Sequence, residues 1–357
     1  MFFQVSSLLA LALAGSALAT PIARSDALKV ELSGAESVTS IDDVKITAAI
    51  TNTGAEAVKV LKYGTIFDGD LMTRSFTVTK DDQDVAFMGI KMSISIPDLD
   101  DSAFATIASG ETVTVQHAVG GLFDFEAAGE GAYSFQPMTS FLVVNGDSLS
   151  PATEMLKTEV ASSALTMTIT GDLAKREVPL EKRARNICTN SSYASFINSA
   201  YSEAKTLAST AASYVSSSGS SSLYRAYFGS ISTSSVRSVL TAVANENSSS
   251  RTLSCVDSYN HCTSGVIAYT VTATTNIYLC PIFFQEVPST YLCTGQTTVA
   301  SRNVRGGTVL HELTHAVGGT KDVTYGCSAD QALSDANSYV NADNYNCFST
   351  QVYANQC

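Results

Sequence analysis

The placement of cysteine divides this chain of 357 residues into two unlike parts. All eight cysteines lie between Cys188 and Cys357, and none precedes them. An even number of cysteines in an exported chain predicts a disulfide framework. A cysteine-rich metal site is the alternative, but the chain has no Cys-x-x-Cys pair to support it. The second part is therefore expected to fold around cross-links that the first part lacks, with the pairing left open by the residues alone.

The N-terminus predicts export. Residues 8–14 are an apolar run, and Ala17-Leu18-Ala19 fits the small-x-small rule for signal-peptide cleavage. The run is too short to span a membrane, and no later run approaches the necessary length. We therefore expect a signal peptide at residues 1–19 and a secreted, extracellular protein without a membrane-spanning segment.

Two dibasic pairs, Lys175-Arg176 and Lys182-Arg183, precede the first cysteine. In a charged linker of an exported chain such pairs predict cleavage by a furin-like or kexin-like processing protease. We expect the cut after Arg183, with Arg185 as the alternative boundary. From residue 186 onward the chain has seven Lys and Arg and nine Asp and Glu, a net charge of −2. The whole chain has a net charge of −12, so most of the negative charge lies before residue 186. The sequence thus predicts an acidic propeptide at residues 20–183 and a second domain at residues 184–357.

The two parts also differ in hydrophobic periodicity. Alternation with a period of two predicts strands in the first part, at residues 28–32, 44–50, 58–61, 76–78, 94–96, 112–117 and 165–169. This pattern favours an all-β sandwich. Helical spacing in the second part predicts helices at residues 193–215, 236–245 and much of 329–355, with a strand or hairpin at residues 265–279. The expected class is α+β: a sandwich-like propeptide, then a mostly helical domain with a small sheet.

The stretch His311-Glu312-Leu313-Thr314-His315 carries the chemistry. Residues four apart lie on one face of a helix, so both imidazoles can reach one metal ion. Glu312 lies beside them, where a carboxylate can hold the water that the metal activates. Histidine occurs only four times in the chain, which makes a chance match improbable. The pattern predicts a zinc hydrolase of peptide bonds, against the alternative of two merely packed or solvated histidines.

A catalytic zinc usually takes three protein ligands and leaves a fourth position for water. No glutamate follows Glu312 and no histidine follows His315. The downstream carboxylates are Asp322, Asp330, Asp335 and Asp343. Two glycines, at 318 and 319, are expected to end the helix, because glycine readily adopts the left-handed conformation found there. The chain can then turn back, and Asp322 is the best candidate for the third ligand.

Together with residues 319–326, Gly-Thr-Lys-Asp-Val-Thr-Tyr-Gly, the stretch resembles the aspzincin signature, HExxH plus GTxDxxYG. This is the signature of deuterolysins, the fungal secreted neutral metalloproteases. The connection between the two elements is shorter than in many members. The resemblance implies a zincin-like domain made as an inactive precursor, with a first part that assists folding and latency. It also implies one zinc per chain on His311, His315 and Asp322, with Glu312 as general base and Tyr325 stabilising the oxyanion.

The same resemblance implies a disulfide pattern, namely Cys188–Cys255, Cys262–Cys280 and Cys293–Cys357, which leaves Cys327–Cys347 as a fourth bridge. Asn190 and Asn247 begin N-glycosylation sequons that export would make usable. Asp343 also resembles a family position important for activity. It could accept a hydrogen bond from a ligating imidazole, or it could be an ordinary carboxylate near the helix surface. His261 is expected to be a polar loop residue beside Cys262 and not a ligand.

The sequence therefore predicts a secreted zinc metalloendopeptidase acting on proteins or peptides through a zinc-activated water and a glutamate base. As in deuterolysins, basic substrates would be favoured, with Asp330, Asp335 and Asp343 attracting lysine or arginine. One alternative is a catalytically silent zinc-binding glycoprotein, whose hallmark would be a damaged Glu312 or Tyr325; both are intact. Another is a binding function of the first part. Neither part is basic, which argues against nucleic acid as a partner, and we expect a monomer.

Overall fold

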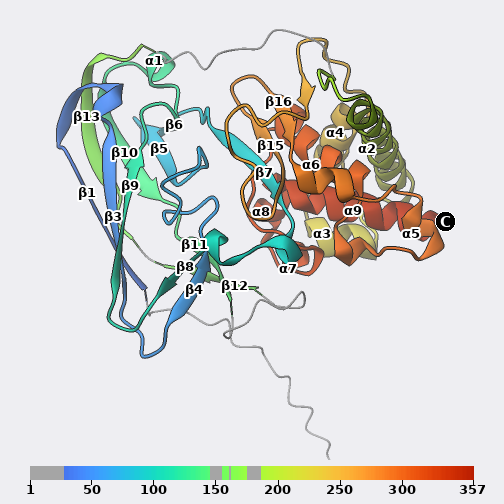
Figure 1. Cartoon of the computed structure of the whole chain (residues 1–357), viewed down its shortest axis with the longest axis horizontal. Coiled ribbons are helices and arrows are strands. Elements are labelled where there is room, and N and C mark those ends of the chain that lie inside the picture. Colours follow the sequence, from blue (N-terminus) through green and yellow to red (C-terminus); the bar gives the residue numbers. More distant parts are fainter. Residues whose placement is uncertain (1–27, 145–154, 161, 175–185) are drawn as a thin grey trace, which may run out of the picture.

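The computed structural model describes residues 28–144, 155–160, 162–174 and 186–357. The predicted signal peptide and both dibasic pairs lie outside these residues. Strands gather on one side of the molecule and helices on the other (Figure 1), and the mixed α+β class predicted from the sequence is confirmed. Within the described residues, no helix is both long and apolar enough to cross a membrane.

Three sheets are built by strands of the first part alone. The first has the order β1 (Leu28–Gly34), β3 (Lys45–Asn52), β9 (Thr112–Ala118). The second has the order β2 (Ser37–Ser40), β13 (Leu165–Asp172), β10 (Gly131–Pro137), β5 (Phe76–Lys80), β6 (Gln83–Asp84). The third has the order β12 (Met155–Glu159), β11 (Ser140–Val144), β4 (Val58–Leu61), β8 (Phe104–Ile107). Short helical segments connect these strands: η1 (Ile41–Asp43), η2 (Ile96–Asp98), η3 (Asp101–Ala103) and α1 (Phe125–Ala128).

Alternating burial explains why these segments form strands. In β3, Ile46, Ala48 and Ile50 are fully buried while the residues between them are partly exposed. They share one hydrophobic core with Phe76 of β5 and Phe135 of β10, so the first two sheets pack on common side chains. Six of the seven predicted strands coincide with observed ones over most of their length, and the seventh shares only Ile94 with an observed strand.

The predicted strand at residues 94–96 is wrong. The strand there is β7 (Ile90–Ile94), and Ile96 opens the 3-10 helix η2. Pro97 is the second residue of that helix, and proline cannot donate to a strand ladder. The alternation of Ile94 and Ile96 therefore marks the end of a strand.

The second part contains α2 (Ser191–Ser218), α3 (Ser222–Phe228), α4 (Thr233–Ala244), η4 (Pro281–Gln285), α5 (Tyr291–Thr294), η5 (Val299–Ser301), α6 (Arg305–Gly318), α7 (Cys327–Gln331), α8 (Asp335–Val340) and α9 (Ala342–Gln356). The predicted helices at residues 193–215 and 236–245 lie in α2 and α4. The region 329–355 is largely helical but divides at Asn341, whose side-chain Oδ1 accepts from the amides of Val323 and Thr324. That contact ties the start of α9 to the loop after α6.

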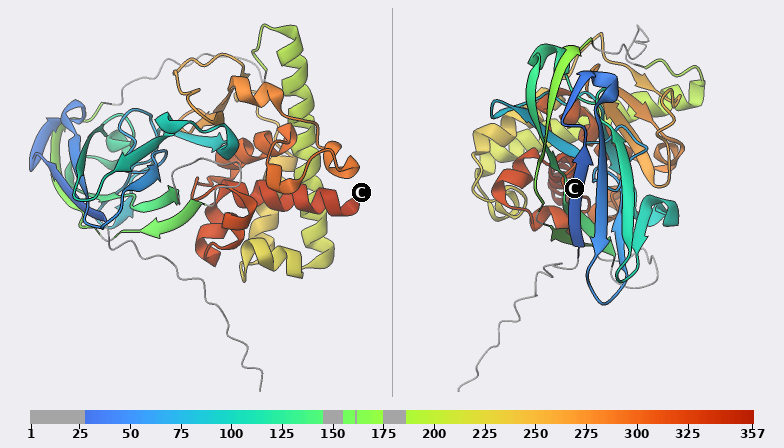
Figure 2. Two further views of the ribbon diagram at one scale, coloured as in Figure 1. Left: turned by 60° about the horizontal axis from the view of Figure 1, so that its bottom comes forward. Right: turned by 90° about the vertical axis from the view of Figure 1, so that its left-hand side faces the viewer.

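Helix α6 lies in the middle of this part, packed against α2, α4 and α9 (Figure 2). Two glycines at its start allow the close approach. A Cβ at Gly306 would lie 2.7 Å from Cβ of Glu203 on α2, and one at Gly307 would lie 2.4 Å from Oδ1 of Asn346 on α9. Beyond them, Leu310 of α6 enters a core that includes Phe348 of α9. The glycines thus fix the helix that carries both predicted histidine ligands.

A fourth sheet joins the two parts. Its order is β14 (Leu253–Ser254), β16 (Asn276–Leu279), β15 (Val266–Val271), β7, and the antiparallel pair β15–β16 is the hairpin predicted at residues 265–279. Strand β7 comes from the first part, crosses to the helical side and pairs antiparallel with β15 (Figure 1). Nothing in the hydrophobic pattern predicts that a strand of the first part joins a sheet of the second.

All eight cysteines are paired in the structure, as Cys188–Cys255, Cys262–Cys280, Cys293–Cys357 and Cys327–Cys347. These are the pairs that the family resemblance implies. The bridges close loops inside the second part, and none reaches the first part because it has no cysteine. Contacts between the two parts are therefore noncovalent.

Candidate metal centre

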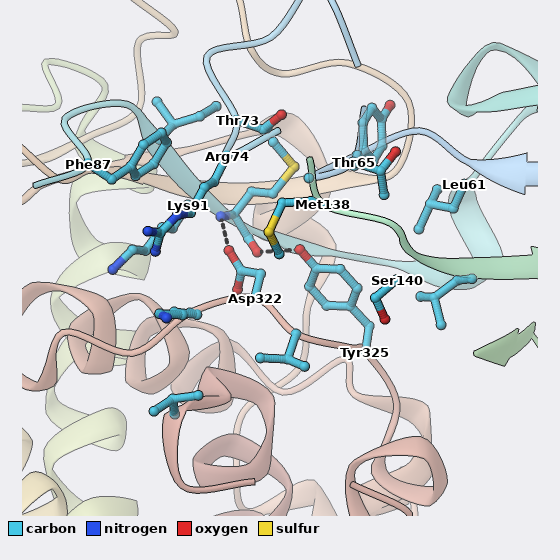
Figure 3. Close-up of a pocket in the computed structure, with 18 of the residues that line it drawn as sticks. Leu61, Thr65, Thr73, Arg74, Phe87, Lys91, Met138, Ser140, Asp322 and Tyr325 are labelled. Carbon is cyan, nitrogen blue, oxygen red and sulfur yellow. Dashed lines mark hydrogen bonds between the residues drawn. The ribbon is translucent and has the colours of Figure 1, made fainter. Parts of the chain in front are cut away.

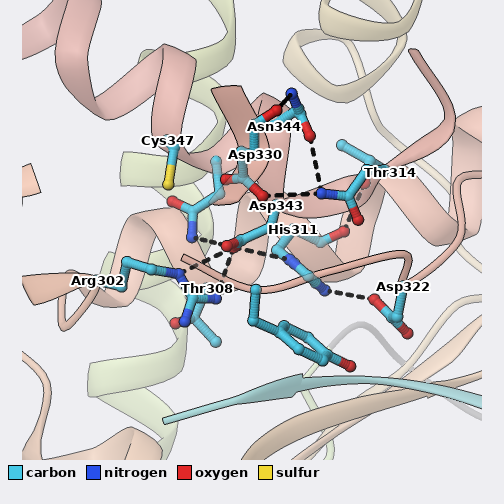
Figure 4. Close-up of polar contacts among 12 residues, drawn as sticks. Arg302, Thr308, His311, Thr314, Asp322, Asp330, Asp343, Asn344 and Cys347 are labelled. Atoms are coloured by element: carbon cyan, nitrogen blue, oxygen red, sulfur yellow. Dashed lines mark hydrogen bonds and ion pairs between the residues drawn. The ribbon is translucent and has the colours of Figure 1, made fainter. Parts of the chain in front are cut away.

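Three side chains converge at the C-terminal end of α6. His311 and His315 lie four residues apart on one face of the helix, and both are buried. Gly319 ends the helix in the left-handed conformation, with φ of 66°, and the chain turns back toward the histidines. Oδ1 of Asp322 then lies 3.1 Å from Nε2 of His311 and 3.0 Å from Nε2 of His315 (Figure 4 shows the first contact).

The donor atoms of this trio suit a metal ion. All three lie within 4.8 Å of one another. Nδ1 of His315 lies 3.1 Å from the main-chain oxygen of Thr320, a pure acceptor, so Nδ1 carries the proton and Nε2 keeps its lone pair. The lone pair of that buried Nε2 faces Oδ1 of Asp322, which is itself an acceptor, so no hydrogen bond satisfies it. Two imidazole nitrogens and one carboxylate oxygen form a ligand set typical of catalytic zinc.

Electrostatics keep Asp322 ionised. Burial alone would raise the pKa of Asp322, but the two adjacent imidazoles hold it well below the ordinary value. Burial would lower the pKa of His311, yet hydrogen bonds with Asp322 and Asp343 and the charges of Asp322 and Glu312 raise it to about 10. His315 shows the opposite result, because burial lowers its pKa to about 4. The trio therefore places a stable negative charge between two imidazoles, which is where a cation would bind.

Glu312 lies beside the trio and is fully buried. Its Oε2 accepts a hydrogen bond of 2.6 Å from the hydroxyl of Thr270 on β15, and its Oε1 has no hydrogen-bond partner. Burial raises the pKa of Glu312 to about 8, while neighbours that include His311, Thr270 and the main-chain N–H of Ser93 oppose that rise. One carboxylate oxygen is thus fixed in place and the other has free lone pairs.

Asp343 lies behind His311, on the side away from Asp322 (Figure 4). Its Oδ1 is 3.5 Å from Nδ1 of His311 and accepts from Nη2 of Arg302 at 2.6 Å. Its Oδ2 accepts from the amide of Gly326 at 2.8 Å. Burial would raise the pKa of Asp343, but the Arg302 guanidinium and His311 hold it well below the ordinary value. Asp343 is therefore a buried, ionised carboxylate beside His311.

The prediction that downstream carboxylates form an acidic surface is wrong for two of the three. Asp330 and Asp343 are fully buried, so neither is a surface carboxylate that could attract lysine or arginine. Burial and the charge of Asp343 raise the pKa of Asp330 well above its ordinary value. Asp335 accepts from the main-chain amide of Ser230 at 3.0 Å. His261 lies in a loop, as expected, but it is buried there and packs against the rings of Tyr259 and Tyr269.

Tyr325 lies at the opposite side of the trio. Its ring stacks on that of His311, with centroids 6.4 Å apart, and its hydroxyl donates to the main-chain oxygen of Met92 on β7 at 3.0 Å (Figure 3). Burial, followed by the charge of Asp322, raises the pKa of Tyr325 well above its ordinary value. The hydroxyl therefore keeps its proton and acts as a donor to carbonyl oxygens.

Several groups around the centre were not predicted from the sequence. Thr270 of β15 and Met92 of β7 are distant in the chain from the HExxH stretch, whereas Arg302 lies in the turn between η5 and α6. Arg302 has the left-handed backbone conformation, with φ of 48°, which is uncommon for a residue other than glycine. This conformation could not be inferred from the sequence. A cavity of about 300 Å³ beside Asp322 and Tyr325 is lined by residues of both parts (Figure 3).

Comparison with known proteins gives consistent matches over the full length. The model of the deuterolysin metalloprotease (M35) family matches residues 1–356. A peptidyl-Lys metalloendopeptidase of Armillaria mellea is 31% identical over 345 residues, covering 92% of this chain and 93% of that protein. Penicillolysin of Penicillium citrinum is 32% identical over 372 residues, covering 99% and 98%. Among solved structures, a zinc peptidase from Grifola frondosa aligns at 25% identity and a TM-score of 0.36, covering 46% of this chain and 97% of that one.

Proposed function

The chain belongs to the deuterolysin metalloprotease (M35) family and is a zinc metalloendopeptidase; on that premise we propose how its residues act. His311, His315 and Asp322 hold a single zinc ion. The observation that carries this assignment is the convergence of one carboxylate oxygen on two buried imidazole nitrogens at 3.0 and 3.1 Å. When bound, zinc lowers the pKa of a water toward 7 and polarises the substrate carbonyl.

Glu312 is the general base; burial raises its pKa, and the charge of a bound zinc would oppose that rise and favour the ionised carboxylate. Its free Oε1 is the group that takes a proton from the attacking water, while Thr270 fixes the other oxygen and so the orientation of the carboxylate. The same carboxyl then returns the proton to the leaving amine. Proton transfer by a positioned side chain typically contributes about 10²–10⁴-fold in rate.

Tyr325 stabilises the developing oxyanion by donating its hydroxyl proton. Support comes from the hydrogen bond that it already makes to a peptide carbonyl, that of Met92, and from the raised pKa that keeps it protonated. Asp343 has a positioning role. It lies against Nδ1 of His311 and is itself held by Arg302, an arrangement that would keep the ring oriented with Nε2 toward the metal.

We further propose that the chain is made as a secreted, latent precursor that acts as a monomer. The signal peptide comprises residues 1–19, the sandwich-like propeptide residues 20–183 and the protease residues 184–357, with processing at Lys182-Arg183. Asn190 and Asn247 are exposed, which suits N-glycosylation. A preference for basic substrates now has support only from the peptidyl-Lys specificity in the name of the Armillaria relative, because the proposed acidic surface is largely buried.

The test is Glu312→Gln in the processed enzyme, assayed on a protein substrate alongside zinc content. We expect zinc to stay near one per chain and turnover to fall by about 10²–10⁴-fold. Glu286→Gln makes the same chemical change at another buried glutamate and should keep zinc and activity. Zinc bound without turnover in the unmodified chain would favour the alternative, a catalytically silent secreted zinc-binding glycoprotein. Substantial turnover by the Glu312 variant would refute the role of the base.

A further inference from the structure

Strand β7 covers the outer edge of the protease sheet. It pairs antiparallel with β15 in the register Tyr269 with Met92, Thr270 with Lys91 and Val271 with Ile90. The order β14–β16–β15–β7 means that β15 would be the edge strand if β7 were absent. An edge strand presents a row of unpaired N–H and C=O groups to which another extended chain can add.

The main chain of Met92 faces the metal centre. Its N–H donates to Oδ2 of Asp322 at 2.8 Å, and its carbonyl oxygen accepts from the hydroxyl of Tyr325 at 3.0 Å (Figure 3). The N–H of Ser93, which belongs to the next peptide bond, approaches Glu312. A proposed zinc ligand, the oxyanion donor and the base thus all face one short stretch of the main chain.

The neighbours of Met92 are also held by the protease part. Nζ of Lys91 donates to the main-chain oxygen of Thr320 at 2.5 Å, and Nη1 of Arg302 donates to the main-chain oxygen of Ile94 at 3.0 Å. Met92 is only 2% exposed. Most of these contacts use main-chain groups of β7, which any extended peptide could supply.

We propose that the edge of β15 is the binding site for the main chain of a peptide substrate, and that β7 occupies it as a built-in substrate mimic. The Met92–Ser93 peptide bond takes the place of the bond to be cut, with its carbonyl at Tyr325 and its amide toward Glu312. This inference rests on the proposed function, because it takes the roles of Tyr325 and Glu312 from it. It gives the precursor its latency: no substrate can pair with β15 while β7 is there.

The absence of any disulfide between the parts fits this role. All four bridges lie within residues 188–357, so β7 is held by hydrogen bonds and packing. Once the linker is cut, the mimic can dissociate and leave β15 open. Latency then results from reversible competition between β7 and the substrate for the edge of β15.

The test uses the full-length, zinc-loaded chain in a Glu312→Gln background, so that no proteolysis occurs. Met92→Pro removes the N–H that donates to Asp322, and proline is tolerated on edge strands. Met92→Leu is the matched control, since it changes the side chain but keeps the main-chain groups. Two readouts are measured: binding of a fluorescent extended hexapeptide containing lysine, and hydrogen exchange of the β15 amides.

We expect Met92→Pro to bind the hexapeptide about 10- to 100-fold more tightly than its parent, because β7 loses its hydrogen bond to the Asp322 carboxylate and competes less well for β15. Its β15 amides should also exchange faster. Met92→Leu should match the parent in both. Faster exchange without tighter binding would overturn the proposal, as would equally tight binding by the parent. If the proline variant does not fold, Tyr325→Phe removes the other hydrogen bond to Met92. Because that variant also removes the donor to a bound peptide, only exchange is read for it, and unchanged exchange of the β15 amides would overturn the proposal.

Failure of this inference is separable from failure of the proposed function. Binding and exchange are read without turnover, so they remain informative if the enzyme cuts nothing. Conversely, a processed wild-type chain that hydrolyses peptides while its precursor binds them equally well would keep the function and discard the mimic.

Discussion

Glu286 gives a pH dependence of stability that can be worked out from its surroundings. It lies against the first turn of α6, where the hydroxyl of Thr308 donates to its Oε1 at 2.7 Å. Its Oε2 is buried without a partner. Burial raises the pKa of Glu286 from 4.5 to about 8, although Thr308 and the charge of Arg302 oppose the rise. The carboxyl is therefore neutral in the folded protein at pH 7.

The sign follows from proton linkage. The folded state binds this proton more tightly than the unfolded state, so the contribution to stability is fully present below pH 4.5 and is lost as the pH rises to about 8. Since one pKa unit corresponds to about 1.4 kcal/mol, the loss across that interval is on the order of 4–5 kcal/mol.

Glu286→Gln imitates the neutral carboxyl at every pH. By urea unfolding of the full chain, followed by circular dichroism with disulfides intact, we expect it to lie within about 1 kcal/mol of wild type at pH 5. At pH 9 it should be more stable than wild type by on the order of 4 kcal/mol. Glu31→Gln, at an exposed ion pair, is the control and should change stability by less than about 0.5 kcal/mol at both values. Parallel loss of stability in wild type and Glu286→Gln would refute the reasoning.

Two further changes test the support of the centre. Asp343→Asn should weaken zinc binding by about 10–100-fold in a chelator competition, because the carboxylate beside His311 loses its charge. Asp335→Asn is the control. Equal zinc affinities of the two variants would contradict the positioning role of Asp343. Cys327→Ala with Cys347→Ala opens a link of 20 residues between α7 and α9 and should cost about 3 kcal/mol in urea unfolding, whereas an unchanged midpoint would show that packing alone holds these helices.

The convergence of His311, His315 and Asp322 was predictable because these residues are close in the chain. Helical geometry places His311 and His315 together, and a glycine at 319 permits the turn that brings back Asp322, so local rules suffice. The burial of Asp330 and Asp343 was not predictable in this way. Their surroundings depend on Arg302 and Asn341, which approach through tertiary packing, and a carboxylate carries no local sign of being buried.

Strand partners were the least predictable part of the fold. A period of two indicates that a segment is a strand with one face inward, but it does not say which sheet receives it. Residues 90–94 lie among strands of the first part in sequence, and the linker lies far downstream. Their pairing with β15 depends on the shape and main-chain groups of a domain that begins about a hundred residues later.

The burial of β15 bears on what must happen when the two parts separate. All six of its residues, from Val266 to Val271, are buried, although it has only β16 as a neighbour besides β7. Without β7, its outer main-chain groups would face water, and an open apolar edge invites association. A substrate in extended conformation satisfies those same groups. The proposed latency and the proposed activity therefore depend on the same main-chain groups of β15. In the precursor β7 would cover them, and in the active endopeptidase they would be free to pair with the substrate.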